Sequence, residues 1–212
     1  AISGGPIYFA DSVGKSNPEI LKKLTLTDGT ILRADQPAVP TEDCLFNVWD
    51  AKPLKVFSKS NGTGLLGVFN AADAEKVEGF FSPKDIDGLD GKNFAVFDYL
   101  NRSVKKMGLN EQIPVSLARM GYQLYFVKPI VQGFASFGLI EKYNAPKTIK
   151  QEIAKESKVL IELYESGTFA AFIEKRPSKV ESANAKPLEY TWKAGLLLVK
   201  VPEGNNTLTI QF

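Results

Sequence analysis

The composition of the chain limits which residues could carry out acid–base or nucleophilic chemistry. The 212 residues include no histidine and one cysteine, Cys44. Without histidine the chain cannot form a Ser-His or Cys-His couple, and it offers no imidazole ligand to a metal. A lone cysteine cannot form an internal disulfide. Acid–base chemistry would therefore have to use carboxylates, lysines or tyrosines.

Paired carboxylates are the main remaining option for catalysis. A retaining glycosidase needs two carboxyl groups roughly 5 Å apart, in environments that separate their pKa values. The chain has 24 Asp and Glu residues, but their spacing does not show which of them meet in space. Carboxylates at such positions are solvated by default. We expect no complete catalytic pair in this chain.

A glycine-rich segment imitates a nucleotide-binding loop. Residues 62–67 read Gly-Thr-Gly-Leu-Leu-Gly, which matches G-x-G-x-x-G. A dinucleotide site requires a helix directly after this motif, whereas Leu65 to Asn70 has the composition of a strand. Asn61-Gly62 is a strong signal for a tight β-turn. We therefore predict a β-hairpin and no cofactor here.

An acidic segment imitates a calcium loop. Asp85, Asp87 and Asp90 lie in Asp-Ile-Asp-Gly-Leu-Asp-Gly. An EF-hand loop needs an oxygen ligand at its fifth position and a glutamate at its twelfth, and these are Leu89 and Val96. We predict a solvated turn with no metal, and a weaker cation site stays open as an alternative.

Overall composition excludes several classes of partner. Basic and acidic residues number 26 and 24, and no basic stripe with interleaved aromatics indicates nucleic-acid binding. No apolar run approaches the ~20 residues that span a bilayer. We expect no nucleic-acid or membrane partner. The lone cysteine, without a signal-like segment, favours the cytoplasm.

The elements that would hold such residues change character along the chain. Residues 1–10 are small and apolar, which is typical of a strand covered on both faces. Ser16-Asn17-Pro18-Glu19 supplies an N-cap, a proline at the first helical position and an early acid. We therefore predict that residues 1–27 form one βα unit, a strand followed by a helix. We expect the chain to begin as a fragment of a longer protein would.

From residue 28 onward the pattern is antiparallel β. Six short runs of β-branched and aromatic residues, separated by turn signals, predict strands: Leu54–Ser58, Leu65–Asn70, Lys76–Phe81, Phe94–Tyr99, Ile113–Leu117 and Gln123–Val127. Leu196–Val201 and Thr207–Phe212 are expected to pair as a hairpin. Thr148–Leu163 fits a helix or a strand, and we favour a helical or loop portion to about Ser157 with strand after it.

Several stretches in this order resemble the carboxy-terminal half of glycoside hydrolase family 36, in the branch of raffinose synthase, seed imbibition protein and alkaline α-galactosidase. They are Gly4–Gly14, Leu21–Leu24, Asp28–Arg33, Pro40–Phe46, Gly67–Asn70, Phe137–Ile140 with Tyr143-Asn144, Gly167–Phe172 and Arg176-Pro177. The resemblance covers nearly the whole chain. Its loops after Phe46 and Asn70 are shorter than in plant members, as in a compact microbial or archaeal α-galactosidase.

The resemblance implies a fold and the position of a sugar site. Residues 1–27 would be the last βα unit of a (β/α)8 barrel, and residues 28–212 an antiparallel β-sandwich. The family's catalytic aspartates would lie upstream, so no catalytic residue is expected in this chain. Barrel sites form at the carboxyl ends of the strands, so Phe9, Asp11 and Ser12 would contact the α-galactoside substrate. Arg33 and Asp43 lie in matched segments and are expected to pair.

The main functional hypothesis is that the chain completes the barrel of a retaining α-galactosidase and is inactive alone. Its partners would be the sugar and the remainder of the barrel, with oligomerisation possible. One alternative is galactosyl transfer of the raffinose synthase type. Another is a stand-alone carbohydrate-binding or structural β-sandwich, with Trp49, Tyr122, Tyr125 or Trp192 as the sugar platform.

Overall fold

The computed structural model describes residues 2–8, 10–46, 50–155, 157–204 and 206–212. Within these ranges the chain forms sixteen strands, one α-helix, α1 (Pro18–Leu24), and three short 3₁₀ turns, η1 (Glu42–Cys44), η2 (Pro83–Asp85) and η3 (Ala145–Thr148). Every strand pairing is antiparallel. The predicted mainly-β, antiparallel class is therefore confirmed.

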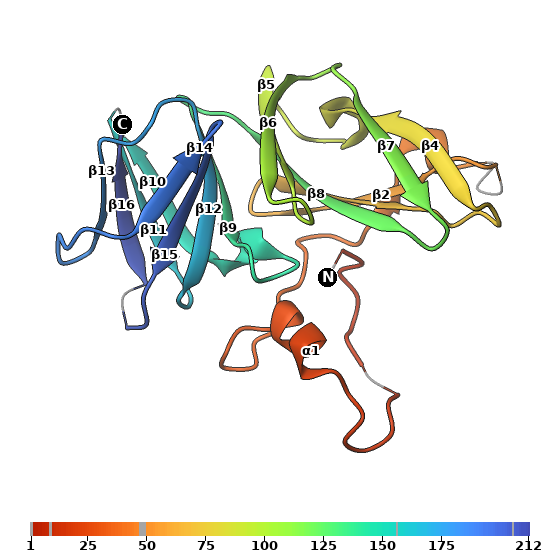
Figure 1. The fold of residues 1–212 in the computed structure, drawn as a ribbon, viewed down its shortest axis with the longest axis horizontal. Helices are drawn as coiled ribbons and strands as arrows, with labels where there is room; N and C mark the ends of the chain where they lie inside the picture. The colour runs from red at the N-terminus through yellow and green to blue at the C-terminus, as the bar shows by residue number, and fades with distance from the viewer. Residues whose placement is uncertain (1, 9, 47–49, 156, 205) are drawn as a thin grey trace.

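The strands form four sheets, which occupy two halves of the molecule with α1 below both in the view of Figure 1. The first eight strands along the chain, β1 to β8, form a six-stranded sheet and a two-stranded sheet. The six-stranded sheet has the order β1 (Val39–Pro40), β2 (Leu54–Ser60), β3 (Thr63–Phe69), β8 (Tyr122–Pro129), β5 (Asn93–Asp98), β6 (Ser103–Gly108). The two-stranded sheet pairs β4 (Lys76–Phe81) with β7 (Ile113–Ala118).

The second half of the chain is a sandwich of two four-stranded sheets. The inner sheet has the order β14 (Tyr190–Lys193), β15 (Leu196–Val201), β12 (Gly167–Ile173), β9 (Phe134–Leu139). The outer sheet has the order β10 (Ile149–Lys155), β11 (Lys158–Leu163), β16 (Thr207–Gln211), β13 (Lys179–Ser182).

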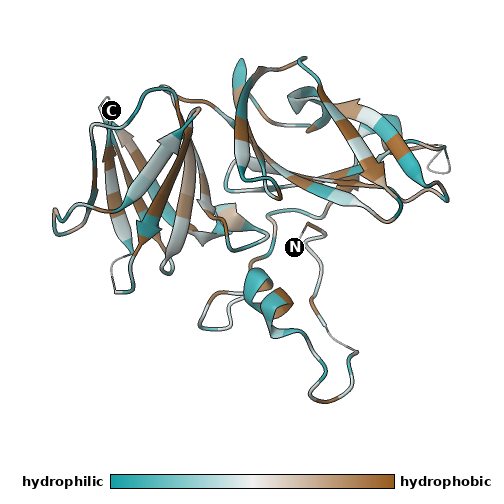
Figure 2. Ribbon diagram, viewed as in Figure 1, coloured by the Kyte–Doolittle hydropathy of each residue, from teal (hydrophilic) through white to brown (hydrophobic). Residues whose placement is uncertain are grey.

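Three apolar cores hold the four sheets together as a stack. Along β3, Leu66 packs toward the two-stranded sheet and Leu65 toward the inner sheet of the sandwich. Along β12, Ala170 faces β3 and its neighbours, whereas Phe169 faces the outer sheet. Because both faces of these central strands are covered, their sequences are continuously apolar instead of alternating. Figure 2 shows this hydrophobic character on the strands and hydrophilic character at the turns.

The G-x-G-x-x-G motif is the predicted hairpin. Asn61 and Gly62 both have positive φ, 48° and 69°, and join β2 to β3, as a tight primed turn requires. The other two glycines allow close approach: a Cβ on Gly64 would lie 2.9 Å from side-chain atoms of Ile86, and one on Gly67 2.7 Å from Ile2. The glycines thus serve packing, and no helix follows them.

The strand expected over residues 1–10 is not present in the described part of this segment. Residues 2–8 form turns and irregular structure. A parallel strand needs neighbours that bond its backbone along its length, whereas the backbone bond from this segment to the rest of the chain runs from Ala38 N to Ser3 O at 3.2 Å. Ile2 instead packs onto the face of the six-stranded sheet.

Two further expectations are wrong: one concerns the secondary structure of residues 149–155, and the other the pairing of the last two strands. Residues 149–155 are strand β10, not helix or loop, and pair with β11. Because β10 is a largely exposed edge strand, its Lys and Glu content resembles that of an amphipathic helix. β15 and β16 are both strands but lie in different sheets. Turn chemistry predicts a reversal of direction, and it does not specify which sheet receives the next strand.

No helix in the described ranges is long and apolar enough to cross a membrane. The six strands predicted from residues 54 to 127 are all confirmed, as β2, β3, β4, β5, β7 and β8.

Candidate functional site

The predicted sugar-binding residues lie in the irregular segment before α1. Phe9 falls outside the described residues. Asp11 and Ser12 are exposed, and the Ser12 carbonyl accepts a hydrogen bond from Lys15 N at 2.9 Å. The rest of the described chain does not enclose them. Their carboxylate and hydroxyl are therefore free to meet groups brought from elsewhere.

Helix α1 forms as its sequence predicts. Asn17 is the N-cap, and its Oδ1 accepts from Glu19 N at 3.0 Å. Pro18 occupies the first turn, where its missing N–H costs nothing. Lys22 pairs with Glu19 at 2.8 Å. At seven residues the helix is too short to be stable alone, so it depends on what it docks against.

The carboxyl end of α1 docks on the loop after β9. Lys142 Nζ donates to the carbonyls of Lys22, at 2.9 Å, and Thr25, at 2.7 Å. The backbone N–H of Tyr143 donates to Lys23 O at 3.0 Å. Carbonyls at a helix end have no partners within the helix, and a lysine placed there is also favoured by the helix dipole. The sandwich thus completes the end of α1.

A buried ion pair completes this dock. Lys142 Nζ lies 2.7 Å from Glu165 Oε1, and each side chain is 9% exposed. The other carboxylate oxygen of Glu165 accepts from Thr27 N at 2.6 Å. A buried pair is tolerated when further hydrogen bonds satisfy both charges, as here. We call Lys142, Glu165 and the backbone of residues 22–27 the α1 clamp. Sequence alone does not distinguish a buried lysine from a solvated one, so the sequence analysis did not predict the Lys142–Glu165 pair.

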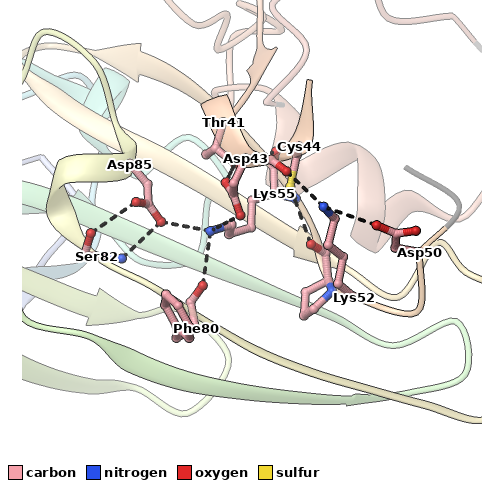
Figure 3. A network of polar contacts seen from close by, with 10 residues as sticks. Thr41, Asp43, Cys44, Asp50, Lys52, Lys55, Phe80, Ser82 and Asp85 are labelled. Carbon is pink, nitrogen blue, oxygen red and sulfur yellow. Dashed lines mark hydrogen bonds and ion pairs between the residues drawn. The ribbon is translucent and has the colours of Figure 1, made fainter. Parts of the chain in front are cut away.

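A second buried lysine organises the edge of the six-stranded sheet (Figure 3). Lys55 Nζ lies 2.9 Å from Asp43 Oδ2, 3.0 Å from Asp85 Oδ2 and 3.1 Å from the Phe80 carbonyl. Ser82 in turn donates to Asp85. These contacts join η1, β2, β4 and η2. The expected Arg33–Asp43 pair is therefore wrong, because Asp43 pairs with Lys55 instead.

Electrostatics favour the charged forms in this Lys55 cluster. Burial opposes the charge of Lys55, but hydrogen bonds to Asp43 and Asp85 outweigh it and raise the Lys55 pKa. Burial likewise opposes ionisation of Asp43, and its bonds with Lys55 and Thr41 prevail and lower the Asp43 pKa. Both groups thus stay ionised near neutral pH. The cluster is a structural tie with no free general acid or base.

An apolar groove of about 440 Å³ opens on the six-stranded sheet beside the N-terminal segment. Its walls include Ile2, Val56, Phe69, Tyr122 and Tyr143. Exposed large apolar side chains are also frequent before residue 47. They are Tyr8, Val13, Ile20, Val39, Leu45 and Phe46. We call this groove together with these side chains the N-terminal apolar surface.

The aromatic residues considered as a sugar platform do not form one. Trp49 lies outside the described residues. Tyr125 is buried against Phe81, and this burial together with the nearby Asp98 charge raises the pKa of Tyr125 to about 12. Trp192 packs on the sandwich core and donates to Ile173 O at 3.2 Å. Tyr122 is half exposed, in the apolar groove.

The acidic turn after η2 is not arranged as a metal site. Asp85 is used by Lys55 and Ser82. Over the described ranges no group of three or more Cys, Asp or Glu side chains is arranged to hold a metal ion.

Comparison with known proteins gives one consistent family. The model for "Raffinose synthase or seed imbibition protein Sip1" matches residues 1–84 and 73–201. A probable galactinol–sucrose galactosyltransferase 6 of Arabidopsis thaliana is 33% identical over 97% of this chain and 33% of its own length. A galactinol–sucrose galactosyltransferase of Oryza sativa subsp. japonica is 30% identical over 95% of this chain and 30% of its own length. A stachyose synthase of Pisum sativum is 28% identical over 95% of this chain and 28% of its own length.

The chain thus spans about a third of the length of these relatives. Among solved structures, an isomalto-dextranase of Arthrobacter globiformis T6 in complex with panose matches 74% of this chain and 33% of its own, at 13% identity and a TM-score of 0.30. That likeness is too weak to bear on function. The family model and the identities agree with the resemblance seen in the sequence, and the chain belongs to the raffinose synthase or seed imbibition protein Sip1 family.

Proposed function

We propose that this chain is the carboxy-terminal, non-catalytic part of a galactosyl-transferring enzyme. The support is its membership of the family and the names of its relatives, which are galactosyltransferases and a stachyose synthase. These names favour transfer of the galactosyl group to a sugar acceptor. The sequence analysis instead favoured hydrolysis. In both reactions a galactosyl group leaves its donor, and the difference lies in whether a sugar or water accepts it.

The observation that carries this proposal is the N-terminal apolar surface. Tyr8, Val13 and Phe46 are 83%, 103% and 79% exposed, and the groove on the six-stranded sheet is lined mostly by apolar atoms. An open apolar groove and several large exposed apolar side chains are typical of a surface that another structure covers. Since the relatives are about three times longer than this chain, we assign this surface to packing against the catalytic barrel of one polypeptide.

The α1 clamp gives that packing a fixed geometry. It ties residues 22–27 to the sandwich through buried charges, so a barrel joined to residues 1–27 would be held at one orientation. Asp11 and Ser12 would then lie at the rim of the sugar site. In this role Asp11 accepts hydrogen bonds from sugar hydroxyls and Ser12 shapes the loop.

The test is an assay with galactinol as donor and sucrose as acceptor. We expect the 212-residue chain to give no product, and the longer polypeptide that contains it to give galactosylated sucrose. Asp11→Asn in the longer polypeptide should raise KM for the donor. Turnover by the 212-residue chain would overturn the non-catalytic role. Free galactose without galactosylated sucrose would replace transfer by hydrolysis.

A further inference from the structure

A polar cleft of about 670 Å³ lies between the loop after α1 and the β10–β11 hairpin. It is separate from the N-terminal apolar surface and borders the α1 clamp at Leu26, and nothing in the function proposed above uses it. Residues 26–34 form one wall, and Ile149 to Glu152 of β10 form the other. Tyr164, after β11, completes the lining. This volume is within the range of small-molecule sites.

The walls of the cleft are joined by part-buried and exposed polar contacts. Asn61 Nδ2 donates to the carbonyls of Pro146, at 2.8 Å, and Ile149, at 3.2 Å. The N–H of Asn61 donates to Asp35 Oδ2 at 2.8 Å, and Lys147 forms an ion pair with Asp35. The loop, the β2–β3 turn and the start of β10 are thus tied together. A ligand would therefore bind a preformed site, and little conformational entropy of the cleft would be lost on binding.

The charges around the cleft balance. Four cationic side chains line it: Arg33, Lys128, Lys147 and Lys150. Lys128 pairs with Glu152 at 3.0 Å and Lys150 with Glu162 at 2.6 Å, and Lys147 pairs with Asp35. Together with Asp28 in the lining, the four acidic groups match the four basic ones. The cleft therefore does not select a phosphate or another strong anion.

Paired charges of this kind suit hydroxyl groups. The Lys128–Glu152 pair places N–H donors beside a carboxylate acceptor in the lining, and a hydroxyl can both accept and donate. Hydrogen bonds to charged groups are stronger than neutral ones. The Arg33 guanidinium makes no hydrogen bond or ion pair with other described residues, since only its backbone N–H is bonded, to Ile31 O. Its five donors are thus available to a ligand.

An aromatic ring supplies the apolar part of the lining. Tyr164 is 52% exposed, and it lines the cleft beside the polar side chains of β10. A half-exposed tyrosine offers a flat apolar face with a polar tip. The C–H face of a pyranose ring packs on such a surface while its hydroxyls reach the charged pairs.

We propose that this cleft binds a neutral oligosaccharide, with Tyr164 against one sugar ring and Arg33, Lys128 and Glu152 bonded to its hydroxyls. The binding would belong to this chain itself. It does not depend on which reaction the longer enzyme performs, so it can hold or fail independently of the proposed galactosyl transfer.

The test is an NMR titration of the ¹⁵N-labelled 212-residue chain with raffinose as the neutral probe and inorganic phosphate as the anionic probe. We expect saturable shifts with raffinose, confined to amides of residues 26–34, 149–152 and 164. Tyr164→Ala and Arg33→Ala should each raise the Kd about tenfold, the change expected when one main contact is lost. Both side chains are exposed, so these variants should fold.

Tyr122→Ala is the matched control, because Tyr122 is a similarly exposed tyrosine in the apolar groove. Its Kd for raffinose should equal that of the unmodified chain. The proposal is overturned if raffinose causes no saturable shift at these amides. It is also overturned if phosphate competes there at equal concentration, or if Tyr122→Ala weakens binding as much as Tyr164→Ala.

Discussion

At the scale of single residues, the buried lysines are the features with the largest expected effect. Lys55 is 5% exposed and has three oxygen partners. Replacing it by methionine keeps the volume but leaves Asp43, Asp85 and the Phe80 carbonyl without their donor. Because both carboxylates keep some contact with solvent, we expect Lys55→Met to lower the free energy of unfolding by about 2 kcal/mol, below the cost of a fully buried pair. Urea denaturation measures this.

The control is Lys76→Met, which removes an exposed pair with Glu78. Exposed pairs contribute less than about 1 kcal/mol, so this variant should change the free energy of unfolding little. Equal losses in the two variants would show that the Lys55 cluster has no special role.

The Lys55 cluster also predicts a pH dependence. The folded pKa of Lys55 is raised above its ordinary 10.5, so its stabilisation is complete below about pH 10.5 and is lost as pH rises through the folded value. The folded pKa of Asp43 is lowered below 3.8, so its stabilisation is complete above that pH and is lost as pH falls further. The difference in unfolding free energy between the chain and Lys55→Met should therefore be greatest from about pH 4 to 10. A difference that stays constant above pH 11 would contradict this cluster.

Sequence patterns identified some of these residues and not others. Asn17 and Pro18 were predicted as helix-start residues because capping depends only on near neighbours. The partners of Lys55 and Lys142 lie far along the chain, at Asp85 and Glu165, and no local pattern marks them. The expected Arg33–Asp43 pair failed for the same reason. The placement of Asp11 and Ser12 at a sugar site stays a prediction.

At the scale of elements, one glycine controls how β9 meets η3. Gly138 has φ +91°, and a Cβ there would lie 2.0 Å from the Ala145 carbonyl oxygen. The clash is with backbone, so it cannot be relieved by a rotamer change. We expect Gly138→Ala to lower the free energy of unfolding by at least about 3 kcal/mol, measured by urea denaturation.

Gly204→Ala is the matched control for this prediction. Gly204 also has positive φ, +76°, but nothing lies within 4 Å of its Cβ position. Only the cost of the left-handed conformation remains, about 1 to 2 kcal/mol. If both variants lose the same stability, the close approach of β9 and η3 is not as the structure has it.

The docking of α1 can be tested by hydrogen exchange. In Glu165→Gln the Thr27 N–H loses its charged acceptor, and Lys142 loses its counter-charge. We expect amides of residues 21–27 to exchange about tenfold faster, while amides of β12 and β15 are unchanged, because local opening requires only local contacts to break. Glu189→Gln, in an exposed pair with Lys200, is the control. Unchanged exchange at residues 21–27 would mean that the clamp does not hold α1.

The positions of some strands were predictable from sequence, whereas β6, β9, β12, β13 and β14 were not predicted, and strand partners were harder still to predict. The six strands from residue 54 to 127 follow from β-branched and aromatic runs between turn residues. β10 was missed because an exposed edge strand carries charges like a helix. The assignment of β15 and β16 to separate sheets depends on long-range packing, which turn residues do not encode.

At the scale of the whole molecule, the N-terminal apolar surface predicts self-association of the isolated chain. Tyr8 and Phe46 are 83% and 79% exposed. We expect Tyr8→Ser with Phe46→Ser to shift the chain toward monomer in light scattering at a fixed concentration, because less apolar area would be removed from water on association. Met120→Ser, at an 85% exposed side chain in the turn between β7 and β8, should have no effect. If the unmodified chain and both variants are all monomeric, self-association gives no evidence for an interface.

The layered architecture explains why the fold class was predictable and the number of layers was not. Continuous apolar runs such as those of β3 and β12 show that a strand is covered on both faces. They do not show what covers each face. Two stacked pairs of sheets and one large sandwich give the same local patterns, and only the three separate cores distinguish them.

We propose that this chain supports galactosyl transfer without carrying the catalytic groups. The most direct measurement is product analysis after incubation with galactinol and sucrose, for the 212-residue chain and for the longer polypeptide that contains it. We expect no product from the chain alone and galactosylated sucrose from the longer polypeptide. Turnover by the chain alone, or release of free galactose as the sole product of the longer polypeptide, would contradict it.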